Sequence, residues 1–285
     1  MALIAAAAQV AAIERAGQRH ITVVGPTRIV WRHWGAGPPI VLVHGDAGSW
    51  THWVRNVLPL AQRFRVIVPD LPGYGESDVL PEPITPERLA RALAEGLRVL
   101  PGAQRTYRLA GFSFGGIVAG HLAAIEGARV ERLVLLGVGG LGLPRPPDPK
   151  LQRPRPDMGP AEVLAVHRHN LAILMFGDPG RVDDLAVHVQ RENIRQARVR
   201  AGGFPASEAL REALPRVGAR LSGIWGERDA FAAPYLAERV ALLHRVQPGS
   251  DVRILPGAGH WTQYEATDEV NTMLMEMLGD APPLG

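Results

Sequence analysis

Short apolar runs alternate along this chain with longer stretches in which apolar residues recur every three or four positions. The short runs, rich in Val, Ile and Leu, favour buried strands, whereas the longer periodicity is typical of amphipathic helices. We expect strands at 21–24, 28–34, 40–44, 65–69, 107–110, 132–136, 221–225 and 252–255. We expect helices at 50–61, 86–99, 114–126, 234–243 and 269–278. This alternation predicts an α/β fold with a mostly parallel sheet covered by helices on both faces, and Gly25-Pro26 predicts an antiparallel hairpin at its start.

The alternation is interrupted in the middle of the chain. Seven prolines fall between residues 144 and 160, and helical periodicity then resumes at 161–176, 182–200 and 207–214. An all-helical insertion in a parallel sheet is expected over the carboxyl ends of the strands, where such sheets bind ligands. We therefore expect a helical cap at 142–216, a core at 21–141 and 217–285, and an N-terminal helical extension at 1–20.

Composition removes several classes of function. The absence of cysteine excludes disulfides, thiolate metal sites and a cysteine nucleophile. The 31 basic residues, of which Lys150 is the only lysine, are scattered among 28 acidic ones, a pattern that does not favour a nucleic-acid partner. No apolar run reaches the ~18 residues of a membrane span. The apolar start of the chain lacks the basic flank of a signal peptide, so we expect no membrane insertion and a cytoplasmic location.

The strongest chemical signal is Gly111-Phe112-Ser113-Phe114-Gly115, which follows one predicted strand and leads into a predicted helix. A G-x-S-x-G turn between a strand and a helix lifts the serine hydroxyl above the sheet, and its glycines relieve crowding. Ser113 is therefore the expected nucleophile.

A serine nucleophile needs a base and an acid that orients the base. His260 lies in a glycine-rich loop after the strand at 252–255, and therefore at the carboxyl edge of the predicted sheet. Asp229 follows the strand at 221–225, and we favour it over the nearby Glu227 as the orienting acid. The chain order Ser113, Asp229, His260 matches one of the known orders of such triads.

The oxyanion of an acyl-transfer reaction needs preorganised donors. We expect the backbone N–H of Phe114 as one donor and that of Asp46, after His44-Gly45, as the other, with Ala47 as the alternative. The Asp46 carboxylate should turn away or be held by a donor. A G-x-G-x-x-G sequence at 137–142 precedes the proline-rich stretch instead of a helix, so we expect no dinucleotide cofactor. We also expect no metal, because the histidines of the cap, His167, His169 and His188, do not form a metal-like i, i+4 pair.

These motifs, together with Asp70-Leu71-Pro72-Gly73-Tyr74-Gly75-Glu76-Ser77, resemble the α/β-hydrolase superfamily over about residues 28–279. The resemblance implies an eight-stranded sheet with a helical cap inserted after the sixth strand, and a serine hydrolase that works without a cofactor. The sequence after His260 is similar to that of the meta-cleavage C–C hydrolases, in which a tryptophan follows the histidine and lines the pocket. That similarity implies that Trp261 lines the pocket. We also expect Phe112 in the pocket, where the chain departs from those enzymes, which usually carry Asn before the serine.

The expected reaction is hydrolysis of a small carboxylic ester or lactone through an acyl-enzyme. The alternative is C–C cleavage of a dienoate diketone by the same triad, and a third reading is a ligand receptor of this fold. C–C hydrolases hold the substrate carboxylate with a cap arginine, and Arg191, Arg195 and Arg198 are the candidates here, although we expect all three to face solvent. A homodimer is left open.

Overall fold

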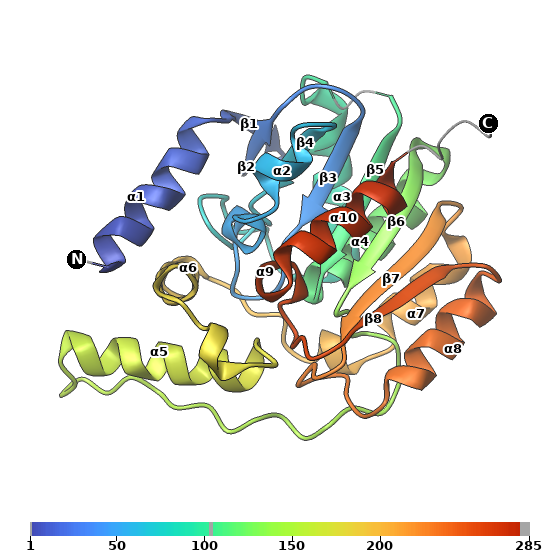
Figure 1. Cartoon of the computed structure of the whole chain (residues 1–285). Helices are drawn as coiled ribbons and strands as arrows, with labels where there is room; N and C mark the ends of the chain where they lie inside the picture. The colour runs from blue at the N-terminus through green and yellow to red at the C-terminus, as the bar shows by residue number, and fades with distance from the viewer. Residues whose placement is uncertain (1, 103–104, 280–285) are drawn as a thin grey trace.

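The chain folds around one sheet of eight strands in the order β1-β2-β4-β3-β5-β6-β7-β8 (Figure 1). The computed structural model describes residues 2–102 and 105–279. The first two pairings, β1 with β2 and β2 with β4, are antiparallel, and the remaining ones are parallel. The strands are β1 Gln18–Val24, β2 Thr27–Trp34, β3 Pro39–Val43, β4 Arg65–Pro69, β5 Tyr107–Phe112, β6 Val130–Leu136, β7 Arg220–Gly226 and β8 Asp251–Leu255. The predicted α/β class, the eight strands and the opening hairpin are confirmed.

Helices cover both faces of the sheet because its central strands are apolar on both sides. Along β3, Val41 and Val43 face one core, with α3 and α4, while Ile40 and Leu42 face the other, with α2 and α10. Alternate residues of a strand point to opposite faces, so a continuous apolar run needs cover on each side. The helices are α1 Ala2–Arg15, α2 Val57–Leu60, α3 Pro86–Val99, α4 Phe114–Glu126, α5 Pro160–Leu174, α6 Asp184–Gln196, α7 Ala209–Ala213, α8 Leu236–Val246, α9 Thr262–Glu265 and α10 Thr267–Leu278.

Between β6 and β7 the chain leaves the sheet for a long insertion. We call residues 142–216 the inserted segment. Its helices α5 and α6 pack against each other, away from the helices that cover the sheet (Figure 1), and α6 also contacts α1. Helix α7, predicted with the others, packs on α4, and its Leu210 is fully buried in the main core.

Some predicted boundaries are wrong. The N-terminal helix ends at Arg15 and β1 begins at Gln18, so the helical extension is shorter than residues 1–20. The helix expected at 50–61 is a 3₁₀ turn, Trp50–Trp53, followed by the short α2, which contains Pro59. A proline there removes a backbone donor and limits the helix. No helix among residues 2–102 and 105–279 is long and apolar enough to cross a bilayer.

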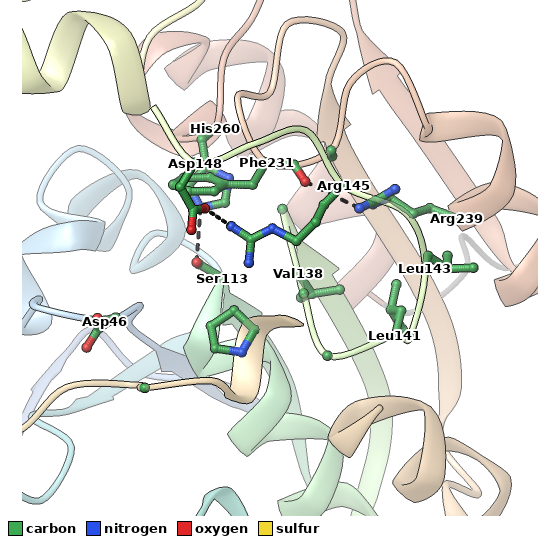
Figure 2. A pocket seen from close by; sticks show the side chains of 17 residues that line it. Asp46, Ser113, Val138, Leu141, Leu143, Arg145, Asp148, Phe231, Arg239 and His260 are labelled. Carbon is green, nitrogen blue, oxygen red and sulfur yellow. Dashed lines mark hydrogen bonds and ion pairs between the residues drawn. The ribbon is translucent and has the colours of Figure 1, made fainter. Parts of the chain in front are cut away.

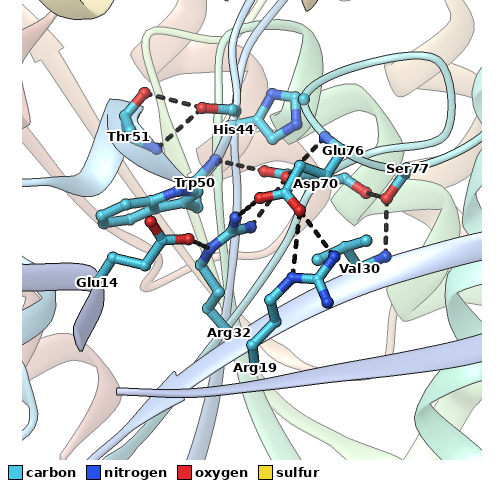
Figure 3. A network of polar contacts seen from close by, with 12 residues as sticks. Glu14, Arg19, Val30, Arg32, His44, Trp50, Thr51, Asp70, Glu76 and Ser77 are labelled. Carbon is cyan, nitrogen blue, oxygen red and sulfur yellow. Dashed lines mark hydrogen bonds and ion pairs between the residues drawn. The ribbon is translucent and has the colours of Figure 1, made fainter. Parts of the chain in front are cut away.

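A buried guanidinium connects the N-terminal helix to the loops near the carboxyl edge of the sheet (Figure 3). The side chain of Arg32, on β2, is 3% exposed and pairs with Glu14 of α1 (2.6 Å), Asp70 (3.0 Å) and Glu76. Burial opposes its charge, but these three carboxylates together raise the pKa of Arg32 above its usual value. Asp70 also accepts a hydrogen bond from the Trp50 N–H (2.9 Å), so the turn after β3 is part of the same network.

Candidate active site

Ser113 sits on a strained turn between β5 and α4. Its φ of +53° and ψ of −122° lie in a region that residues with a side chain rarely adopt. The glycines on either side are required by space: a Cβ on Gly111 would lie 2.6 Å from the Gly115 carbonyl oxygen, and one on Gly115 would lie 2.1 Å from the His44 carbonyl oxygen. This crowding explains the spacing of the G-x-S-x-G sequence and leaves the Ser113 hydroxyl above the sheet.

Ser113, His260 and Asp229 form a continuous hydrogen-bonded chain. The Ser113 Oγ lies 3.0 Å from His260 Nε2, and His260 Nδ1 lies 2.8 Å from Asp229 Oδ2. His260 and Asp229 are 3% and 1% exposed. The second oxygen of Asp229 accepts the Phe231 N–H at 2.8 Å, which fixes the plane of the carboxylate. The sequence thus predicted three residues that the fold brings together from β5 and from the loops after β7 and β8.

Glu227, the competing acid, has a different partner. Its carboxylate accepts the Gly257 N–H at 2.8 Å and lies exposed, where it ties the loop after β7 to the loop after β8.

Two backbone amides are available beside the serine. Within the described residues, neither the N–H of Phe114, at the start of α4, nor that of Asp46 donates a hydrogen bond. The His44 ring fixes the approach to Asp46: its Nε2 accepts the Leu71 N–H (2.9 Å) and its Nδ1 donates to the Gly45 carbonyl (2.8 Å). Burial lowers the pKa of His44, so the ring stays neutral in this tautomer.

The side chain of Asp46 is held by two donors. Its Oδ1 accepts the Tyr74 hydroxyl at 2.7 Å and the Ala201 N–H at 3.0 Å. The next residue, Ala47, has a φ of +47°, which turns the chain sharply after Asp46.

Two cavities meet at Ser113 and His260. One, of about 300 Å³, is lined by residues 137–143 and also by Arg145 and Arg239. Figure 2 shows Ser113 and His260 on one side of this cavity and the Arg239 side chain on the other. The larger one, of about 730 Å³, lies against the inserted segment, including its helices α5 and α6. A substrate with two arms on either side of a reacting carbonyl fits this division.

The structure corrects the predicted pocket. Phe112 lines the larger cavity, but Trp261 lines neither cavity: it is fully buried, its indole N–H donates to the His52 carbonyl (2.9 Å), and its ring stacks on Tyr264 at 4.2 Å. Helix α6, which was expected to carry all three stripe arginines, ends at Gln196 and so contains only Arg191 and Arg195.

None of the three stripe arginines lines either of the two cavities at Ser113. Arg191 and Arg195 are exposed beside Glu192, and Arg198 lies beyond the helix, where it donates to the Gly75 carbonyl at 3.1 Å. The arginines at the larger cavity are Arg153 and Arg200.

His52 lines the larger cavity and was missed by the sequence reasoning. Its Nδ1 accepts the Gly45 N–H at 3.2 Å, and burial places its pKa well below the usual value, so the remaining ring proton is on Nε2. The only available signal was its position among tryptophans in Trp50–Trp53, directly after the loop that contains Asp46.

Comparison with known proteins agrees with this geometry. The sequence profile described as "Alpha/beta hydrolase family" matches residues 40–273. The chain belongs to the alpha/beta hydrolase family.

Two relatives of this hydrolase are named as dienoate or dienedioate hydrolases. A 2-hydroxy-6-oxononadienedioate/2-hydroxy-6-oxononatrienedioate hydrolase of Cupriavidus pinatubonensis is 31% identical over 297 residues, covering 96% of this chain and 99% of the relative. A 2-hydroxy-6-oxo-6-phenylhexa-2,4-dienoate hydrolase of Burkholderia cepacia is 27% identical over 267 residues, covering 86% and 89%. Among solved structures, an esterase of Thermogutta terrifontis is 26% identical with a TM-score of 0.65, covering 91% and 97%. This hydrolase is therefore similar both to C–C hydrolases and to esterases.

Proposed function

We propose that this hydrolase cleaves a carboxylic ester or lactone through an acyl-enzyme, with the inserted segment acting as a cap over the site. The observation that carries the proposal is the hydrogen-bonded chain from Asp229 through His260 to Ser113 at the junction of two cavities. Such a chain activates a hydroxyl for attack on an acyl carbon, and the two cavities suit the acyl and alcohol arms.

In the first half-reaction, the Ser113 Oγ attacks the ester carbonyl carbon while its proton moves to His260 Nε2. The carbonyl oxygen becomes an oxyanion, which the N–H groups of Phe114 and Asp46 stabilise. As the intermediate collapses, the C–O bond to the alcohol breaks and His260 gives its proton to the departing oxygen.

In the second half-reaction, a water molecule attacks the acyl carbon and passes its proton to His260. Collapse returns that proton to Ser113 Oγ and releases the acid. Asp229 holds the Nδ1 proton of His260 throughout and stabilises the imidazolium.

The predicted arginine stripe and Trp261 give no support to a dienoate diketone over an ester. The carboxylate of such a diketone needs a charged partner when it is buried, and the stripe of Arg191, Arg195 and Arg198 does not line the pocket. The indole N–H of Trp261 donates to the His52 carbonyl, and Phe112, the residue before Ser113, has no hydrogen-bonding side chain.

C–C hydrolysis remains the second candidate for two reasons. The two relatives described above are dienoate hydrolases by name. Arg153 and Arg200 line the larger cavity, and Arg145 and Arg239 line the smaller one, so each cavity offers guanidinium groups to a carboxylate.

The test is a substrate panel that pairs p-nitrophenyl esters of several chain lengths with a carboxylated meta-cleavage dienone, each with the unsubstituted protein and with Ser113→Ala. We expect multiple turnovers on esters, reduced about 10⁴–10⁶-fold by Ser113→Ala. Turnover of the dienone alone would favour the C–C reaction. A single slow turnover on every compound would favour a receptor, and full activity of Ser113→Ala would remove the triad from the reaction.

A further inference from the structure

We propose that Tyr74 and the backbone N–H of Ala201 are positioning groups that keep the Asp46 carboxylate away from the oxyanion formed at Ser113. This inference rests on the proposed acyl transfer, because it concerns the donors that stabilise that oxyanion.

A carboxylate at residue 46 opposes the chemistry assigned to its own backbone. The N–H of Asp46 is assigned to the oxyanion in the proposed reaction, so the side chain of the same residue brings a full negative charge close to a second, developing one. The carboxylate is also a strong acceptor. If it were free to rotate, it would compete with the oxyanion for the Phe114 N–H.

The backbone around Asp46 is fixed, so side-chain rotation is the remaining freedom. The Gly45 N–H donates to His52 Nδ1, and the Gly45 carbonyl accepts from the His44 ring. These bonds fix the peptide groups before and after Gly45, but they do not restrain the Asp46 carboxylate.

Two donors from separate parts of the chain supply that restraint. Tyr74, in the loop after β4, donates its hydroxyl to Asp46 Oδ1 at 2.7 Å, and Ala201, in the inserted segment, donates its N–H to the same oxygen at 3.0 Å. Figure 2 shows the Asp46 side chain directed away from Ser113. The two bonds converge on one oxygen, and together they define the direction of the carboxylate.

Tyr74 is suited to this task at any ordinary pH. It is fully buried and packs edge-on against the His44 ring, with ring centroids 5.4 Å apart. Burial, and after it the charge of Asp46, raise the pKa of Tyr74 far above its usual range, so the hydroxyl keeps its proton.

The second donor makes the restraint depend on the inserted segment. Gly202 lines the smaller cavity and Arg200 the larger one, so Ala201 lies in the stretch that closes both. When this stretch is in place, it contributes one of the two bonds to Asp46. The carboxylate is thus fully restrained only while the site is covered.

The test is a double-mutant cycle of Tyr74→Phe and Asp46→Asn, measured as the second-order rate of Ser113 phosphonylation by an alkyl fluorophosphonate. This reaction needs the nucleophile and the oxyanion donors but no knowledge of the natural substrate. Tyr74→Phe keeps the buried ring and removes only the hydroxyl. We expect it to slow labelling about 10–100-fold when Asp46 is present, because the carboxylate is released. In the Asp46→Asn background the same change should alter the rate by less than about threefold, because no charge remains to be restrained.

Tyr107→Phe is the matched control, because Tyr107 is also buried and its hydroxyl also donates to a carboxylate, that of Glu126, away from the cavities. It should label at the unsubstituted rate. If Tyr74→Phe lowers the thermal midpoint strongly, Ala201→Pro provides the second variant, since it deletes the other donor and should show the same dependence on Asp46.

Equal slowing by Tyr74→Phe in both backgrounds would overturn the inference, because it would show a structural role that is independent of charge. An unchanged rate in the Asp46 background would overturn it as well. Labelling of Ser113 without coupling refutes this inference alone, whereas an unsubstituted protein whose Ser113 does not label refutes the proposed function and this inference together.

Discussion

Glu265 is the residue whose substitution tests most directly how the inserted segment is joined to the active site. Its carboxylate is 7% exposed and accepts three backbone donors. Oε1 accepts the N–H groups of Gly177 (3.1 Å) and Asp178 (2.9 Å), and Oε2 accepts those of Gly177 (2.9 Å) and Gly259 (2.7 Å). Gly259 precedes His260, so one carboxylate links the end of the α5 region to the triad loop. The perturbation is Glu265→Gln, which keeps the shape and removes the charge.

The size of the effect follows from the geometry. Glutamine has one carbonyl oxygen, so in either orientation its NH₂ group faces at least one N–H donor. A hydrogen bond to a charged acceptor contributes about 1.5–3 kcal/mol, and a buried donor left without a partner costs about 1–3 kcal/mol. We therefore expect a loss of about 2–5 kcal/mol in the free energy of unfolding. With about 2.1 cal/mol/K of unfolding entropy per residue over 285 residues, the melting temperature should fall by about 3–8 °C.

The assay is thermal unfolding followed by circular dichroism, with Glu227→Gln as the matched control. Glu227 is exposed and accepts one N–H, that of Gly257, in the same pair of loops. Its substitution should cost less than about 1 kcal/mol, or under about 2 °C. Equal, small changes for both variants would refute the reasoning, because they would mean that the three buried donors of Glu265 contribute no more to stability than the single donor of the exposed Glu227.

Three further predictions concern the chemistry and the inserted segment. Asp229→Asn should lower ester turnover by about 10⁴-fold because it favours the wrong imidazole tautomer, whereas Glu227→Gln should cost less than about tenfold; the reverse order would transfer the role to Glu227. Limited proteolysis should cut first within residues 145–155, which have no regular structure. Endoproteinase Lys-C should give two fragments, because Lys150 is the only lysine of the chain. First cuts within β3 or β6 would show that residues 145–155 are better protected than their lack of regular structure implies. Arg200→Gln should change ester turnover by about twofold or less, and a selective loss of dienone cleavage in this variant would instead support the C–C reaction.

The sheet and the meeting of Ser113, Asp229 and His260 were predictable because they follow from local signals and one rule of geometry. Continuous apolar runs give the strands, and the carboxyl ends of parallel strands lie at one edge of the sheet. Residues placed just after β5, β7 and β8 therefore converge whatever the details of packing.

The pocket was not predictable in the same way, because its lining depends on contacts between distant parts of the chain. Trp261 is adjacent to His260, yet a bond to the His52 carbonyl draws its ring into the core. The arginines of α6 share a helical stripe, but periodicity does not tell which side of the helix faces a cavity. Arg153, at the larger cavity, comes from a proline-rich stretch that has no periodicity.

The Arg32 network has a consequence for the construction of chimeras. Glu14 lies outside the part of the chain that the family profile matches, but it supplies one of the three carboxylates that neutralise Arg32. Exchange of the first 17 residues for a sequence without an acidic residue at position 14 would therefore remove a counter-charge from a buried cation and disturb Asp70, which also accepts the Trp50 N–H. A functional junction between two relatives should keep Glu14, Arg32 and Asp70 from the same parent.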